Sequence, residues 1–127
     1  MLKEAVICIV IIIGIFGLEY YTQGFTEKTV NEVTDIFDKI EENISKRDIE
    51  QIDNEIKNIE SKWEEKQKNL AYYIEHDELE KVHTAIVTMK SYVESEEFSS
   101  ASAELAEGRF VIEHIQEKNS FNLQNIF

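Results

Sequence analysis

Apolar side chains after residue 25 recur at alternating intervals of three and four residues, the spacing of a buried helical stripe. Four stripes follow one another: Val30, Val33, Phe37, Ile40 and Ile44; Ile49, Ile52, Ile56, Ile59, Trp63, Leu70 and Tyr73; Leu79, Val82, Ile86, Met89 and Val93; and Phe98, Ala101, Leu105, Gly108, Ile112 and Ile115. Lys66 is the polar interruption of the second stripe. The three-and-four spacing is interrupted between one stripe and the next. On a continuous helix this shift in register would move the apolar stripe to the opposite face of the helix. The pattern therefore predicts separate helices joined by turns.

Polar residues near the slips offer side-chain acceptors for the free amides at helix starts. The predicted N-terminal caps are Ser45 with Asp48, Asp77 with Glu80, and Ser99 or Ser100. The chain contains no proline, and Gly108 is its single glycine after Gly24. Because breakers do not mark the helix ends, fusion of two neighbouring helices around His76 stays open.

An uncharged apolar run from Ala5 to Leu18 precedes the stripes. As a helix it spans about 21 Å, which is short against a hydrocarbon core of about 30 Å. Tyr20, Tyr21 and Phe25 can lengthen the span at the headgroup level, and Lys3 can reach the opposite surface. We therefore predict a membrane helix that contacts lipid through residues 5–21. A cleaved signal peptide is the alternative, although no A-x-A-like site follows the run.

The predicted fold class is all-α, with an N-terminal transmembrane helix followed by an antiparallel bundle of about four helices. We divide the chain into an anchor or signal peptide at 1–25, a bundle domain at 26–118 and an apolar C-terminal tail at 119–127. Cys8 is the single cysteine, so no intramolecular disulfide can form. The bundle must be held together by packing. We interpret Trp63 as a core residue whose ring nitrogen reaches an acceptor at the rim, and Gly108 as a helix crossing point.

The charge is distributed unevenly along the chain. Lys3 and Glu4 cancel, so residues 19–127 carry the whole net charge of −13. Nucleic acid and anionic lipid are therefore poor partners, because both require a basic face. Lys3 is the one basic residue before the span, which favours a cytoplasmic N-terminus. We expect a single-pass protein of the cell membrane whose bundle is extracytoplasmic.

Candidate chemistry is sparse. Glu80 and His83 form an E-x-x-H step that places both groups on one helix face, as in carboxylate-bridged di-iron bundles. Such a site needs a second E-x-x-H step, which the sequence lacks. His76, Glu80 and His83 remain a candidate small-ligand or metal site. The main expectation is a protein without a metal or a cofactor. We also expect no catalytic activity, because the sequence shows no nucleophile with a paired base.

The C-terminal end from Ser120 to Phe127 is apolar, although loose termini are normally polar. We expect this segment either to fold back on the bundle or to dock into another protein. The residues proposed to bind a partner are Phe121, Leu123, Asn125, Ile126 and Phe127.

The apolar N-terminal span, the helix centred on Trp63, the segment from Tyr73 to Leu79 and the ending from Ser120 to Phe127 resemble a family. It is an uncharacterised domain-of-unknown-function family of short, single-span helical proteins from Gram-positive bacteria, many of them spore formers. The resemblance implies a location in the bacterial envelope. It also implies that His76, Glu78 and the tail matter beyond local packing.

These observations predict a membrane-anchored, extracytoplasmic helical protein with an interaction or accessory role in the cell envelope. The bundle would present its tail, or a seam left open by Gly108, to another protein. Self-association through the same stripes is a close variant. The rival interpretation is a helical domain that binds a small ligand or a divalent metal.

Overall fold

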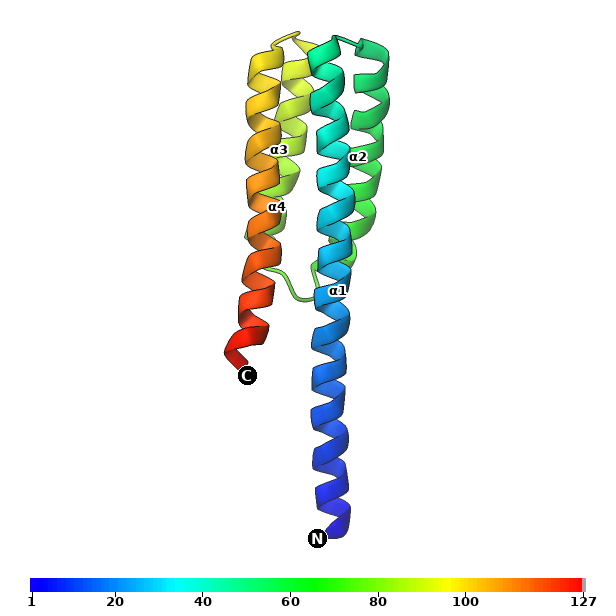
Figure 1. The fold of residues 1–127 in the computed structure, drawn as a ribbon, viewed down its shortest axis with the longest axis vertical. Coiled ribbons are helices and arrows are strands. Elements are labelled where there is room, and N and C mark those ends of the chain that lie inside the picture. The colour runs from blue at the N-terminus through cyan, green and yellow to red at the C-terminus, as the bar shows by residue number, and fades with distance from the viewer. Residues whose placement is uncertain (127) are drawn as a thin grey trace.

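The computed structural model describes the backbone of residues 1–126 and the side chains of residues 1–119. It contains four helices in these residues and no strand: α1 (Leu2–Lys46), α2 (Ile49–Leu70), α3 (His76–Glu94) and α4 (Phe98–Ile126). Figure 1 shows the helices running alternately up and down, with the N-terminal part of α1 projecting from one end of the bundle. The helices pack in the ring order α1, α2, α3, α4, and α2 contacts α3 the least. The predicted all-α bundle is confirmed.

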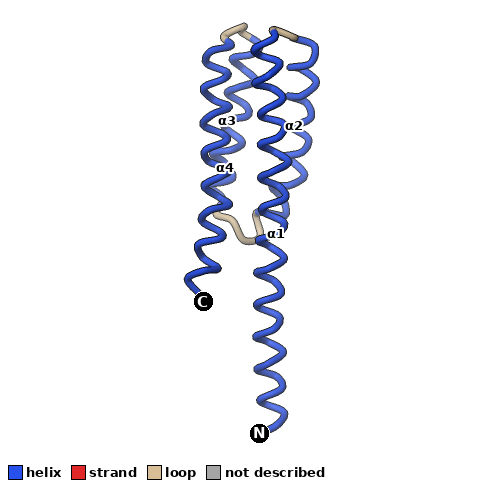
Figure 2. Tube along the Cα trace, in the orientation of Figure 1, coloured by secondary structure: helices blue, strands red, loops and turns tan. Residues whose placement is uncertain are grey.

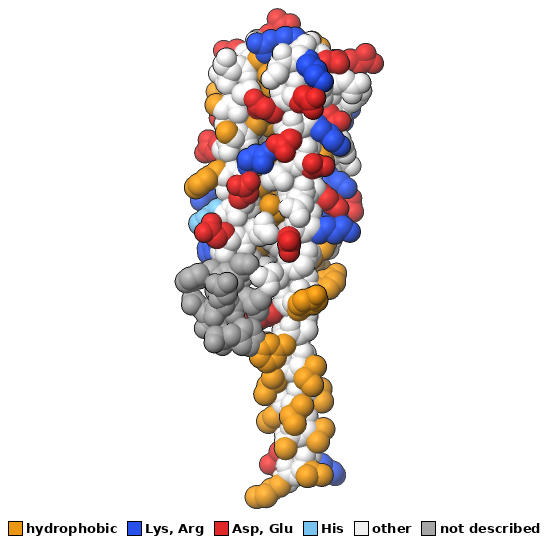
Figure 3. Space-filling model, viewed as in Figure 1, with side chains coloured by type: hydrophobic (Ala, Val, Ile, Leu, Met, Phe, Trp, Pro, Cys, Tyr) orange, Lys and Arg blue, Asp and Glu red, His pale blue; other side chains and the backbone are white. Residues whose placement is uncertain are grey.

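Helix α1 belongs to two environments without a break between them. Its first buried side chain is Thr26, and the buried stripe continues to Ile44. Before Thr26 the helix is long and apolar enough to cross a membrane, and none of its most apolar window is buried in the protein. A helix in the core of a soluble protein would be mostly buried. Figure 3 shows hydrophobic side chains around the projecting part, whereas charged side chains cover the bundle face in view.

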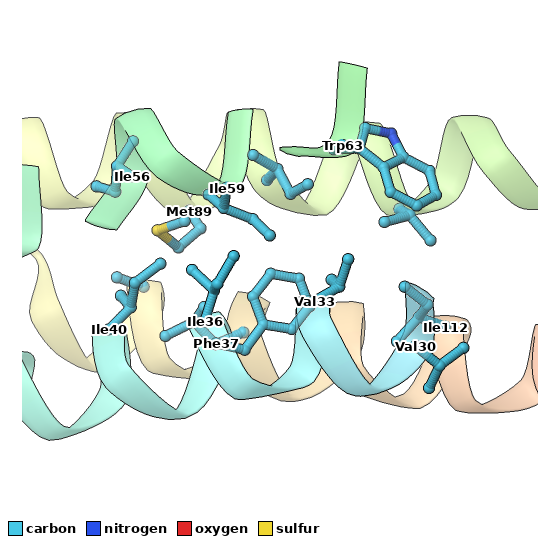
Figure 4. Close-up of a cluster of buried hydrophobic side chains, with 14 of the residues drawn as sticks. Val30, Val33, Ile36, Phe37, Ile40, Ile56, Ile59, Trp63, Met89 and Ile112 are labelled. Atoms are coloured by element: carbon cyan, nitrogen blue, oxygen red, sulfur yellow. The ribbon is translucent and has the colours of Figure 1, made fainter. Parts of the chain in front are cut away.

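The predicted stripes form one continuous core (Figure 4). Tyr73 and Phe98 pack against its edge and are partly buried. Ile49 was predicted wrongly, because it is 45% exposed. It is the first residue of α2, at the end of the bundle, and Ile52 occupies the buried position one turn later. The spacing also missed Ile36, which widens the buried face of α1.

The turn between α1 and α2 consists of Arg47 and Asp48 (Figure 2). Arg47 adopts a left-handed conformation with φ 56°, and the Asp48 amide donates to the Asn43 carbonyl at 3.0 Å, which closes the end of α1. Asp48 itself caps α2, since its carboxylate accepts from the Gln51 amide at 3.3 Å. The predicted Ser45 cap is therefore wrong: Ser45 lies inside α1.

The other predicted caps are also wrong. Helix α3 begins at His76, and the residue before it, Glu75, makes no side-chain capping bond, so Asp77 lies within the first turn. Helix α4 begins at Phe98, which places both candidate serines inside the helix. Residues 71–75 separate α2 from α3, so no fusion occurs around His76. The backbone bonds of the turns, rather than nearby polar side chains, set these boundaries.

Gly108 lies at a helix crossing, as predicted, but it leaves no open seam. A Cβ atom built there would approach the Ala85 Cβ and the Phe37 Cε2 to 3.3 Å each. Both neighbouring side chains are buried. The expectation that Gly108 opens a binding surface is therefore wrong, because α1 and α3 side chains fill the space.

We expect Gly108→Val to destabilise the bundle by about 2 kcal/mol, because its branched side chain must displace a buried ring and a neighbouring helix. The measurement is thermal unfolding of the full-length protein in detergent micelles, followed by circular dichroism. Gly24→Val is the matched control, because nothing lies within 4 Å of a Cβ atom built at Gly24. Equal melting temperatures for the two variants would contradict the tight crossing.

Candidate functional site

The edge between α2 and α3 carries two adjoining hollows. One has a volume of about 270 Å³ and the other about 390 Å³. They share Gln67 of α2 and His83 of α3, and we refer to the two together as the α2–α3 groove. Its lining residues are Glu60, Trp63, Glu64, Gln67, Lys68, Ala71, His76, Leu79, Glu80, His83, Ile86 and Val87. The groove lies where the bundle is least tightly packed.

The three predicted ligand residues meet in this groove. His76, Glu80 and His83 lie on one face of α3 and line the larger hollow. The His76 Nε2 is 3.7 Å from the Glu80 Oε2, and both side chains are largely exposed. Among the residues that the structure describes, no group of three or more His, Cys, Asp or Glu side chains could hold a metal ion.

Trp63 is a buried residue that lines the smaller hollow. It is 2% exposed, and the prediction that it is a core residue is confirmed. Its Nε1 has no hydrogen-bond partner within the described structure, so the predicted rim acceptor is wrong. Figure 4 shows this nitrogen on the edge of the ring turned away from Val30 and Val33. A buried donor without a partner costs about 1–3 kcal/mol.

The groove also carries charge. The Glu60 Oε1 is 3.0 Å from the Lys90 Nζ, and this carboxylate raises the pKa of Lys90. Glu64 and Glu80 add negative charge along the same edge. The lining residues include no Ser, Thr or Cys, so nucleophilic catalysis has no hydroxyl or thiol there. The arrangement favours binding of a neutral or cationic group.

A second polar cluster lies at the end of the bundle from which α1 projects, here called the base. The Tyr73 hydroxyl is 2.7 Å from the Thr26 Oγ1 and donates to the Thr22 carbonyl at 3.2 Å. The Asn119 amide donates to the same Thr26 oxygen at 3.4 Å. The cluster joins α1, the α2–α3 turn and α4. Sequence spacing placed Tyr73 on a stripe but gave no signal for these long-range bonds.

Lys66, the polar interruption of the second stripe, also points to the base. Its Nζ lies 5.4 Å from the centre of the Phe25 ring and 3.8 Å from the Glu32 carboxylate, which Lys62 approaches to 3.7 Å. The ring and the carboxylate together stabilise the charge of Lys66 on a largely covered side chain. Lys66 is therefore part of the α1–α2 interface.

The five predicted tail residues lie outside the described side chains. The backbone of α4 continues as a helix to Ile126. Whether the Phe121, Leu123, Asn125, Ile126 and Phe127 side chains bind a partner stays a prediction.

The fold and its groove define a class: an up-and-down four-helix bundle carried on an apolar N-terminal helix extension. A family described as a domain of unknown function, DUF4363, matches residues 20–126. The chain belongs to this family, in agreement with the resemblance to an uncharacterised domain family. No curated protein and no solved structure matches the chain.

We expect Tyr73→Phe to lower the free energy of unfolding by about 1 kcal/mol, because the hydroxyl bonds to α1 are lost. The matched control is Tyr72→Phe, which removes a hydroxyl from a side chain that is 88% exposed. Thermal unfolding of the full-length protein in micelles compares the two. Equal effects at both positions would show that the base cluster does not stabilise the fold.

The loss of stability caused by Tyr73→Phe should depend on pH. Burial raises the pKa of Tyr73 above its ordinary value near 10. The stabilisation by its neutral hydroxyl is therefore complete below about pH 10 and is lost as pH rises through the higher folded-state pKa. The difference between the wild type and Tyr73→Phe should shrink in that range.

Proposed function

We propose that this protein is a single-pass membrane protein of the bacterial cell envelope. Its helical bundle would lie outside the cytoplasm and act as an interaction or accessory module without catalytic activity. The observation that carries the proposal is the unbroken α1 helix, whose exposed apolar part leads directly into the buried stripe that begins at Thr26. A continuous helix fixes the bundle beside the membrane rather than releasing it on a flexible linker.

Charge supports the proposed orientation. Lys3 precedes the span, whereas residues 19–127 carry the whole net charge of −13. Positive residues favour the cytoplasmic side of a membrane helix. The resemblance to an envelope family of Gram-positive bacteria agrees with this placement.

The α2–α3 groove is the proposed surface for recognition. The seam expected at Gly108 is filled by the Phe37 and Ala85 side chains, so we propose the groove as the binding surface instead. Val87 in the groove is 52% exposed, and the unpartnered Trp63 Nε1 offers a donor to an incoming carbonyl or hydroxyl group. The tail from Phe121 to Phe127 is the second proposed surface, on the basis of its apolar sequence.

A small ligand in the same groove is the second candidate function. The observation that favours it is the buried indole donor beside His83 and Gln67. The small ligand and the protein partner can be distinguished by their effects on the purified protein. A small ligand would change the emission of Trp63, the single tryptophan, without adding measurable mass to the purified protein, whereas a protein partner would add mass.

Cysteine labelling in intact cells tests the proposed topology. In a Cys8→Ser background, Ser95→Cys places a thiol on the exposed turn between α3 and α4, and Leu2→Cys places one before the span. We expect a membrane-impermeant maleimide to label residue 95 in intact cells and residue 2 only after permeabilisation. The protein should also stay in the membrane during an alkaline carbonate wash.

The reverse labelling pattern would contradict the proposed orientation. A shortened protein that the carbonate wash releases would show that the apolar segment is a cleaved leader.

A further inference from the structure

The turn between α2 and α3, residues 71–75, lies beside α1 at the level where α1 leaves the bundle (Figures 1 and 2). This position is fixed by hydrogen bonds. The Tyr73 hydroxyl contacts the Thr26 hydroxyl at 2.7 Å and the Thr22 carbonyl at 3.2 Å. The turn therefore cannot move along α1 without breaking these bonds.

The uncharged run from Ala5 to Leu18 measures about 21 Å as a helix, and continuing it to Tyr21 gives about 26 Å. With Tyr20 and Tyr21 at the headgroup level, this run crosses a hydrocarbon core of about 30 Å that thins locally. When this run spans the bilayer, Thr22 lies at the headgroup level on the side of the bundle. The hydrogen bonds of Tyr73 then hold the α2–α3 turn at that same level.

Three tyrosines at this level are turned to the outside. Tyr20 is 81% exposed, Tyr21 is 69% exposed and Tyr72 is 88% exposed. Tyr20 and Tyr21 end the apolar part of α1, whereas Tyr72 lies on the turn. Tyrosine prefers the boundary between headgroups and hydrocarbon, where its ring is covered and its hydroxyl stays hydrated. In water, Tyr72 would leave a large ring uncovered.

A zwitterionic surface carries no net charge, so the acidic side chains near the turn, which include Asp77, do not exclude contact with it, and two of them are paired. Glu75 of the turn is 3.2 Å from Lys118 of α4, and Glu78 is 3.7 Å from Lys81. Both carboxylates are therefore paired with an ammonium group. The acidity of the remaining bundle disfavours anionic lipids.

We propose that the α2–α3 turn is a second membrane contact, in which Tyr72 inserts between lipid headgroups beside the α1 span. This inference rests on the proposed membrane anchoring and adds a second point of contact with the lipid. The bundle stands directly on the bilayer with its base in the headgroup layer, and the α2–α3 groove opens just above the membrane surface. The ligand of this surface is a zwitterionic lipid headgroup together with the adjoining acyl carbons.

Fluorescence quenching by spin-labelled lipids tests the contact. The full-length protein with Cys8→Ser carries the fluorophore NBD at a single introduced cysteine and is reconstituted in phosphatidylcholine vesicles. The test position is Tyr72→Cys, and the control is Ser95→Cys on the turn at the opposite end of the bundle. We expect headgroup-labelled lipid to quench the probe at residue 72 several-fold more than the probe at residue 95.

A third position separates this inference from the proposed function. Ile12→Cys lies within the apolar run, and a chain-labelled lipid should quench its probe when α1 spans the bilayer. Quenching at residue 12, with residue 72 no more quenched than residue 95, would overturn the second contact and leave the membrane anchoring intact. Absence of quenching at residue 12 would overturn both.

Discussion

Burial of one stripe of α1 against α2 and α4 is the interaction on which the remaining structure depends. Val33 and Ile40 of this stripe are fully buried, and α1 contacts both neighbouring helices along it. Because the same helix is exposed before residue 19 and uncharged from Ala5 to Leu18, its path through the bundle also fixes the axis of the projecting segment. The apolar extension and the folded domain therefore share one continuous helix, and their relative position is set by packing rather than by a linker.

The two ends of the bundle differ in the length of their turns and in the way these are closed. The end at Lys46 is closed by short turns in which Arg47 and Glu96 adopt left-handed conformations. The end beside the span has the longer turn, held by the hydroxyl of Tyr73. Surface ion pairs such as that between Lys46 and Glu42 contribute little in solvent, so apolar packing stabilises the fold.

Sequence alone predicted the helices and their buried faces because packing repeats every three or four residues, as the stripe from Val30 to Ile44 shows. It failed at helix starts, because α1 continues past Ser45 and α3 begins before Asp77, so both residues lie inside helices. It predicted that Gly108 marks a crossing but not that Phe37 fills the space, which depends on helix order and rotation. The groove and the unpartnered nitrogen of Trp63 depend on the spacing between two helices, which a one-dimensional pattern does not encode.

Helix α1 runs unbroken from its apolar segment into the bundle. Double electron–electron resonance between spin labels at Leu18→Cys and Ser45→Cys, in a Cys8→Ser background and a lipid bilayer, tests it most directly. Both positions are exposed. A continuous helix predicts a narrow distance distribution near about 40 Å. A broad distribution with shorter distances would reveal a hinge between the span and the bundle and would contradict the account.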